Sequence, residues 1–124
     1  MGYSVRYART SRFLHILARS RQDGSYLNLL HSLNKTEVWI LDDWMRDPVQ
    51  LFAAQDLLEV FDDRFGKTAT IIASQVPVAE WHARFPDPTL ADAILDRSVH
   101  NAYRLSLTGD SQRKLRGFRT MPHT

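Results

Sequence analysis

The spacing of hydrophobic residues changes repeatedly along this chain, and each change predicts a new element of secondary structure. Alternation with a period of two predicts strands, and recurrence every three or four residues predicts helices. The pattern predicts strands at 3–7, 38–41, 68–73 and 102–107, and helices at 10–21, 26–33, 48–65, 79–84 and 89–97. Strands that alternate with helices in this way indicate a parallel sheet covered by helices.

The clearest single feature is an apolar run that ends in two carboxylates. Val38-Trp39-Ile40-Leu41 is followed directly by Asp42 and Asp43. A run of this kind is typical of a buried parallel strand, whose carboxyl end lies where open α/β sheets bind ligands. Mg²⁺ often takes one or two carboxylates together with phosphates and water, which suits this pair. The alternative is that the two acids only cap a helix or solvate a loop.

Two polar residues follow the next predicted strand. Ser74 and Gln75 come directly after the run at 68–73. If that strand neighbours the one at 38–41, both side chains lie beside the two acids and can orient a water molecule or a phosphate. The alternative is that they simply begin a loop.

Arg97 is the third candidate, because it lies near the end of a predicted helix. A guanidinium there can stabilise the charge of phosphoryl transfer on the nucleotide of a neighbouring subunit. The alternative is a pair with Asp96, or an interaction with the carboxyl end of its own helix.

Composition excludes several classes of protein. Hydrophobic residues make up 44% and charged residues 24% of the 124, as in ordinary globular proteins. No apolar run reaches the roughly 20 residues that cross a bilayer. The chain has no cysteine, which excludes disulfides and fits a cytoplasmic protein, and its five histidines form no zinc motif. The three tryptophans fit a core better than a base-stacking surface.

Charge is distributed unevenly around a net value of +2. Five arginines precede the first acid at Asp23, and a second basic group, Arg113 to Arg119, follows Asp110. Basic ends of this kind are consistent with contacts to a nucleic-acid backbone, or alternatively with solvated helix faces and a loose tail.

Several of these segments, in this order and spacing, resemble the IstB-like ATP-binding proteins, AAA+ helpers of insertion-sequence transposition that are related to the helicase loader DnaC. The resemblance extends from about Gly2 to Arg116. The segments that carry it are 38–43, Thr70 to Pro77, Glu80-Trp81, Ala93 to Arg97 and Leu107 to Ser111.

The resemblance implies roles for the candidate residues. Asp42 stands at the position of the acid that holds Mg²⁺, and Asp43 at that of the acid that activates water. Gln75 replaces the usual sensor Asn, with Ser74 beside it facing the nucleotide, and Arg97 corresponds to an arginine finger that acts on a neighbouring subunit. The implied cofactors are ATP and Mg²⁺. The implied partners are DNA, a transposase and further copies of the chain.

One expected motif is absent from the sequence. No G-x-x-x-x-G-K-S/T segment, the Walker A phosphate loop, occurs anywhere in the chain. We therefore expect an α/β parallel sheet of the P-loop NTPase (AAA+) type that lacks its Walker A strand, with a gap between the strands at 70–73 and 102–107. Residues 1–110 are expected to form a partial ATPase domain, and 111–124 a basic tail.

The sequence leaves open whether this chain is an enzyme. Because the phosphate loop is missing, we expect it to bind ATP weakly or not at all by itself. Two alternatives remain: a non-enzymatic remnant that binds DNA or a partner protein, and part of a helicase loader similar to DnaC.

Overall fold

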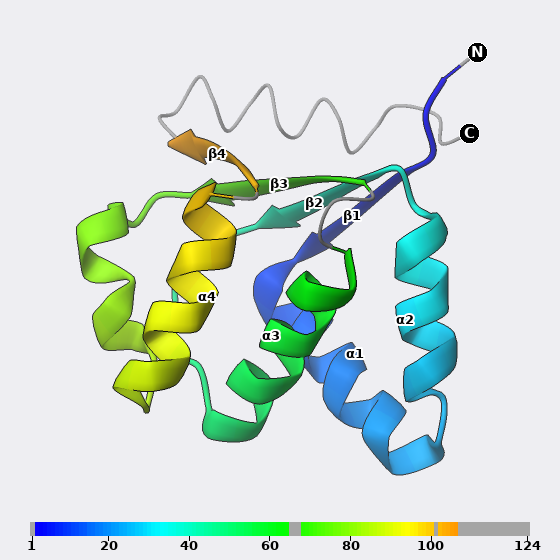
Figure 1. Ribbon diagram of the computed structural model, residues 1–124, viewed down its shortest axis with the longest axis horizontal. Coiled ribbons are helices and arrows are strands. Elements are labelled where there is room, and N and C mark those ends of the chain that lie inside the picture. Colours follow the sequence, from blue (N-terminus) through cyan, green and yellow to red (C-terminus); the bar gives the residue numbers. More distant parts are fainter. Residues whose placement is uncertain (1, 65–67, 101, 107–124) are drawn as a thin grey trace.

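The computed structural model describes residues 2–64, 68–100 and 102–106. Within these residues, four parallel strands form a single sheet in the order β1-β2-β3-β4. Helices connect consecutive strands, as Figure 1 shows. The elements are β1 (Val5–Arg9), α1 (Thr10–Asp23), α2 (Tyr26–Lys35), β2 (Val38–Asp42), α3 (Leu51–Arg64), β3 (Ala69–Ser74), the 3₁₀ turns η1 (Val78–Glu80) and η2 (His82–Arg84), α4 (Pro88–His100) and β4 (Tyr103–Ser106). The predicted α/β parallel sheet is confirmed.

The start of the third helix was predicted too early. The helix α3 begins at Leu51 rather than at Pro48. Val49 is buried, and its backbone N–H donates to the carbonyl of Arg84 at 2.8 Å. This long-range bond keeps the segment before α3 out of the helix and ties it to η2, where two 3₁₀ turns replace the short helix predicted at 79–84.

The expected gap in the sheet is wrong. β3 and β4 pair directly, with Ile71 opposite Tyr103 and Ser74 opposite Ser106. An open gap would leave the backbone N–H and C=O groups of two strands without partners, and direct pairing satisfies them. The described strands therefore form a continuous sheet.

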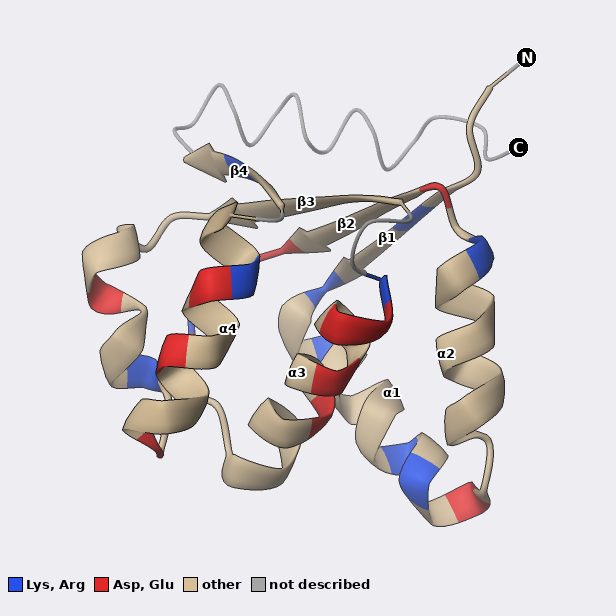
Figure 2. Ribbon diagram, viewed as in Figure 1, with Lys and Arg blue, Asp and Glu red and all other residues tan. Residues whose placement is uncertain are grey.

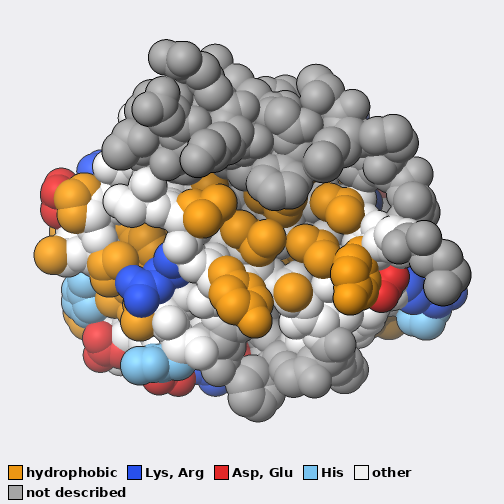
Figure 3. All heavy atoms as spheres, turned by 90° about the horizontal axis from the view of Figure 1, so that it is seen from above, with side chains coloured by type: hydrophobic (Ala, Val, Ile, Leu, Met, Phe, Trp, Pro, Cys, Tyr) orange, Lys and Arg blue, Asp and Glu red, His pale blue; other side chains and the backbone are white. Residues whose placement is uncertain are grey.

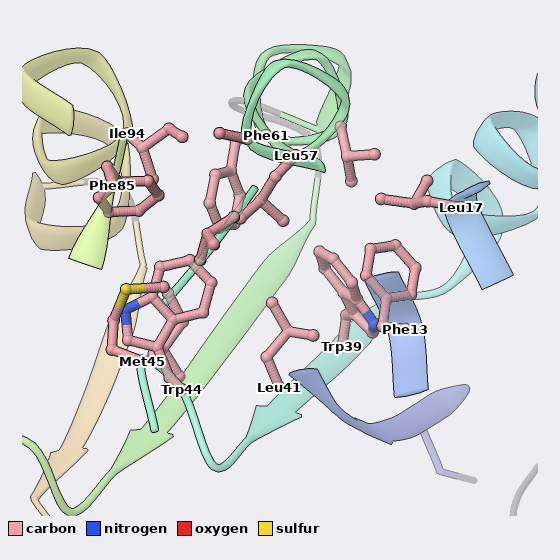
Figure 4. Packing of buried hydrophobic residues seen from close by; sticks show 14 of the residues in the cluster. Phe13, Leu17, Trp39, Leu41, Trp44, Met45, Leu57, Phe61, Phe85 and Ile94 are labelled. Atoms are coloured by element: carbon pink, nitrogen blue, oxygen red, sulfur yellow. The ribbon is translucent and has the colours of Figure 1, made fainter. Parts of the chain in front are cut away.

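The four α-helices of the described residues cover the same face of the sheet (Figure 1). Their apolar side chains pack on Trp39 and Leu41, which project from β2 into the main core (Figure 4). Phe13 meets Trp39 edge-on at 4.8 Å between ring centroids, and Trp44 meets Trp81 at 5.9 Å. The three tryptophans are therefore core residues, as their pattern predicted.

The opposite face of the sheet is also apolar. Ile40 and Ala73 form a second buried cluster there, with Val5, Tyr7 and other side chains of β1, β2 and β3 against them. Figure 3 looks onto the molecule from this side and shows hydrophobic side chains gathered across it. Because side chains alternate along β2, Asp42 projects to the same face as Ile40.

Some predictions fall on residues that the structure does not describe. These are the helix end near residue 65, the division at residue 110 and the basic tail at 111–124, which stay predictions. Within the described residues, no helix is long and apolar enough to span a membrane.

Candidate functional site at the carboxyl edge of the sheet

The loop after β2 is fastened to β3 by two hydrogen bonds. The backbone N–H of Trp44 donates to the carbonyl of Ala73 at 3.0 Å, and the hydroxyl of Ser74 donates to the carbonyl of Trp44 at 2.6 Å. Asp43 and Met45 have positive φ angles of 53° and 63°. The chain therefore turns sharply at the carboxyl edge, and this turn separates the two acids.

Asp42 is the more buried of the two, with 9% of its surface exposed. Its Oδ1 accepts a hydrogen bond from the backbone N–H of Asp43 at 2.8 Å, and its Oδ2 accepts one from the hydroxyl of Tyr7. Its backbone carbonyl accepts a third from the hydroxyl of Thr10 at 2.9 Å. The carboxylate is thus held from β1 and from its own loop, and its carbonyl from the start of α1.

The sequence offers Thr10 or Ser11 as a cap for the helix that follows the first strand, and neither residue caps α1. The N-cap residue is Arg9, and no side chain caps the helix there. Thr10 is the first residue of the helix, and its hydroxyl is used to hold Asp42 instead. A sequence cannot distinguish these uses, because both need a short hydroxyl side chain at a helix start.

Asp43 lies at the cleft between α1 and α3, and its carboxylate makes longer, weaker contacts than that of Asp42. Its Oδ2 lies 3.7 Å from Nε of Arg9 and 3.9 Å from Nη1 of Arg46, both of which are more than half exposed. Exposed pairs at such distances contribute little to stability. Asp43 also lines a cleft of about 760 Å³ between α1 and α3, whose walls include Leu14 and Phe52. Its carboxylate is therefore accessible from the cleft, while Asp42 faces the other side of the sheet.

The strands that end in Asp42 and Ser74 are neighbours, because β2 and β3 pair in parallel, so the condition set for Ser74 and Gln75 is met. Ser74 is 4% exposed, and its Oγ also accepts the backbone N–H of Val76 at 3.0 Å. Its hydroxyl is therefore occupied by backbone groups that shape the edge. Gln75 follows as an exposed residue. Their roles toward a nucleotide stay predictions.

Arg97 lies at the opposite edge of the sheet from the residues at the ends of β2 and β3. It is near the carboxyl end of α4, where its guanidinium pairs with Asp62 of α3 and Nη1 donates to the carbonyl of Ala93 at 3.0 Å. Helices in such units run antiparallel to the strands, so the carboxyl ends of α3 and α4 lie at the amino edge of the sheet. Of the two alternatives for Arg97, the structure has no pair with Asp96, whose carboxylate lies 3.8 Å from His100, while the bond to Ala93 is an interaction with the last turns of its own helix.

The acids at the edge fit Mg²⁺ in their chemistry. Mg²⁺ prefers carboxylate oxygens, usually one or two, and completes its shell with phosphates and water. Within the described residues, no group of three or more His, Cys, Asp or Glu side chains is placed to hold a metal ion. Asp42 is buried and its carboxylate is oriented by two hydrogen bonds, and its role toward the ion stays a prediction.

No local pattern in the sequence marks Tyr7, Thr10 or Arg9 as part of this edge. All three come from β1 and the start of α1, which the register of the sheet brings against Asp42: Arg9 pairs with Asp42 across the parallel ladder. The alternation at residues 3–7 showed which positions share a face. It did not show which strand lies beside them, or in which register.

Comparison with known proteins identifies a family and several relatives of this chain. Residues 1–119 match the sequence model of the family described as IstB-like ATP binding protein. The insertion sequence ATP-binding proteins y4pL and y4uH of Sinorhizobium fredii are 49% and 46% identical to it, over 90% and 93% of this chain. The matched regions make up only 45% and 46% of those relatives, so the chain spans less than half of their length.

Solved structures with similar folds come from replication initiation. AMPPCP-bound DnaA from Aquifex aeolicus superposes with a TM-score of 0.67 at 15% identity, covering 99% of this chain and 39% of that one. Domain III of the DnaA protein from Thermotoga maritima gives a TM-score of 0.64 at 17% identity, covering 91% of this chain and 46% of that one. These similarities support a fold of the AAA+ P-loop NTPase type.

Proposed function

The chain belongs to the family of IstB-like ATP-binding proteins, and from this premise we propose that it contributes the metal-holding side of an ATP site. The observation that carries the proposal is the burial and hydrogen bonding of the Asp42 carboxylate. It ends β2, an inner strand of the sheet, and it is buried and fixed by hydrogen bonds to both carboxylate oxygens. A buried acid held in this way at the carboxyl edge of a parallel sheet suits binding of a cation and its attached phosphates.

Each residue at the edge has a proposed task. Asp42 holds Mg²⁺, which when bound neutralises charge on the phosphate oxygens. Asp43, exposed to the cleft, accepts a hydrogen bond from water and orients it. Ser74 fixes the Trp44 carbonyl and so keeps the turn between the acids in place. Gln75, exposed beside it, is proposed to contact the nucleotide.

Arg97 is proposed to act on a second copy of the chain. Its position near the carboxyl end of α4 is remote from Asp42 within one copy, so contact with a nucleotide at the edge needs another subunit. The guanidinium must then exchange Asp62 for a phosphate. This partner is half exposed, which makes such an exchange inexpensive.

The proposal is tested by titrating the chain with a fluorescent ATP analogue, with and without Mg²⁺. Because the sequence has no Walker A motif, we expect weak binding that requires Mg²⁺ and is abolished by Asp42→Asn. Asp47→Asn is the matched control, since Asp47 is an exposed acid of the same loop. Equal binding by wild type and Asp42→Asn would contradict the role of Asp42. Micromolar affinity would contradict the expectation of weak binding.

A second candidate function, DNA binding, is supported by the arginines of β1 and α1. Arg6, Arg9 and Arg12 line a groove of about 430 Å³ along the edge strand β1, with Phe13 and Ile16 forming part of its wall. Clustered guanidinium groups bind phosphate backbones without reading sequence. As a helper of transposition, the DNA-bound protein would act together with a transposase and with further copies of itself. As a helicase loader, it would bind DNA through the same surface.

DNA binding is tested by the salt dependence of affinity for a short duplex. Arg12→Ala is expected to weaken binding and to lower the slope of log affinity against log salt by about 1. Arg104→Ala is the control, because Arg104 is exposed on β4, the strand at the edge of the sheet opposite to β1. Equal effects of the two substitutions would show that the groove has no special role.

A further inference from the structure

Tyr7 combines an apolar and a polar contact on the second face of the sheet. Its ring packs against the cluster of Ile40 and Ala73, and its hydroxyl donates to Oδ2 of Asp42. In the parallel register Tyr7 is opposite Ile40 and Arg9 is opposite Asp42, so the hydroxyl reaches diagonally across the ladder. The ring is thus fixed by packing while its polar end reaches the acid.

This contact matters because a lone carboxylate rotates easily about its last torsion angle. A carboxylate offers about four lone-pair positions for hydrogen bonds or metal ions. In Asp42 the Asp43 N–H takes one position on Oδ1, and the Tyr7 hydroxyl takes one on Oδ2. With both oxygens held, the plane of the carboxylate is fixed and the remaining lone pairs have defined directions.

We propose that Tyr7 is a positioning residue that orients Asp42 for a divalent cation. The inference rests on the proposed function, in which Asp42 holds Mg²⁺. Groups that hydrogen-bond to metal ligands fix their orientation, and their loss typically weakens metal binding by about 10–100-fold. Tyr7 supplies such a bond from a rigid strand, so less freedom is lost when the ion binds.

The competing explanation is that Tyr7 only fills space in the second cluster. Tyr7→Phe separates the two, because phenylalanine keeps the ring and removes only the hydroxyl. Tyr103→Phe is the matched control: Tyr103 is 70% exposed and lies on β4, two strands away from Asp42.

The test is a titration of the whole chain with Mn²⁺, following free Mn²⁺ by electron paramagnetic resonance, with Mg²⁺ as competitor. Asp42→Asn identifies the binding that depends on Asp42. We expect Tyr7→Phe to weaken that binding at least about tenfold, and Tyr103→Phe to leave it unchanged. Unchanged or tighter binding in Tyr7→Phe would overturn the inference.

Hydrogen exchange provides a second readout that needs no metal. If Tyr7 holds the carboxylate, its loss weakens the bond between Oδ1 and the Asp43 N–H, so that amide exchanges faster in Tyr7→Phe. The Trp44 amide, bonded to Ala73, serves as an internal control and should not change.

The two readouts separate failure of the inference from failure of the proposed function. If wild type shows no Mn²⁺ binding that depends on Asp42, the metal role of Asp42 fails. Faster exchange at Asp43 in Tyr7→Phe would then still support Tyr7 as the residue that orients the carboxylate. Unchanged exchange would overturn that as well.

Discussion

The guanidinium of Arg64 lies 5.2 Å from the centre of the Trp39 ring, between the end of α3 and the sheet. Arg64 is only 3% exposed, and burial lowers its pKa to about 10. Its hydrogen bonds go to neutral oxygens: the hydroxyl of Thr70 and the backbone carbonyls of Leu33, Thr36 and Ala69. Two of these carbonyls belong to the carboxyl end of α2 and the residue after it, where a helix carries partial negative charge. Arg64 therefore joins α2, α3 and β3.

Replacing Arg64 by lysine should destabilise the chain although the charge is kept. A lysine cannot reproduce the planar fork of donors, so several buried oxygens lose their partners. We expect a loss of about 2–4 kcal/mol in the free energy of unfolding, measured by urea denaturation. Arg21→Lys is the control, since the half-exposed Arg21 bonds to Asp56 and Glu59 on the surface. Figure 2 shows basic residues on α1 and acidic residues on α3. Equal losses in the two variants would contradict a clamp at Arg64.

Tyr26 should make stability fall at alkaline pH. Its ring is 5% exposed, with the Arg21 guanidinium 3.5 Å from the ring centroid. Burial, together with the nearby Glu59 carboxylate, raises the pKa of Tyr26 to about 12. The folded state thus favours the neutral phenol. The resulting stability is complete below about pH 10 and is lost as pH rises from about 10 through 12.

The measurement is urea denaturation of wild type and Tyr26→Phe from neutral pH to about pH 11. The free energy of unfolding of wild type, relative to that of Tyr26→Phe, should fall as pH rises from about 10. Arg64 acts in the opposite direction, because a lowered pKa means that its burial cost fades above about pH 10. The arginine is present in both proteins, so its contribution cancels in the difference. A constant difference would show that Tyr26 ionises normally.

Ser74→Ala should cost about 1–2 kcal/mol of stability, because it leaves the Trp44 carbonyl without its hydroxyl donor in a buried position. Ser106→Ala is the control, since Ser106 pairs with Ser74 across the ladder but is exposed. Denaturation of both variants measures the difference. Unchanged stability in Ser74→Ala, together with loss of nucleotide binding, would instead favour direct contact between Ser74 and the nucleotide.

Asp43 should be sensitive to the shape of its replacement more than to its charge. At a φ of 53° a β-branched residue is strained, whereas Asn tolerates this conformation. We expect Asp43→Val to cost about 1–2 kcal/mol and Asp43→Asn less than about 0.5 kcal/mol, by thermal or urea denaturation. A large loss in Asp43→Asn would mean that the pairs with Arg9 and Arg46 stabilise the turn strongly.

The sequence by itself determined the order and type of nearly all elements, the tryptophan core and the family. These depend on local information: the period of the hydrophobic pattern separates strand from helix, and the run at 38–43 marks a buried strand that ends in acids. The family assignment is confirmed because short segments, each weak alone, occur together in one order.

Only the tertiary structure decided which groups meet. The pairing of β3 with β4, the bond from Val49 to Arg84, and the convergence of Tyr7 and Thr10 on Asp42 all join residues distant in sequence. The opposite directions of Asp42 and Asp43 follow from a left-handed turn that is anchored to β3. Such choices depend on strand register and on where buried polar groups find partners, and no local pattern encodes either.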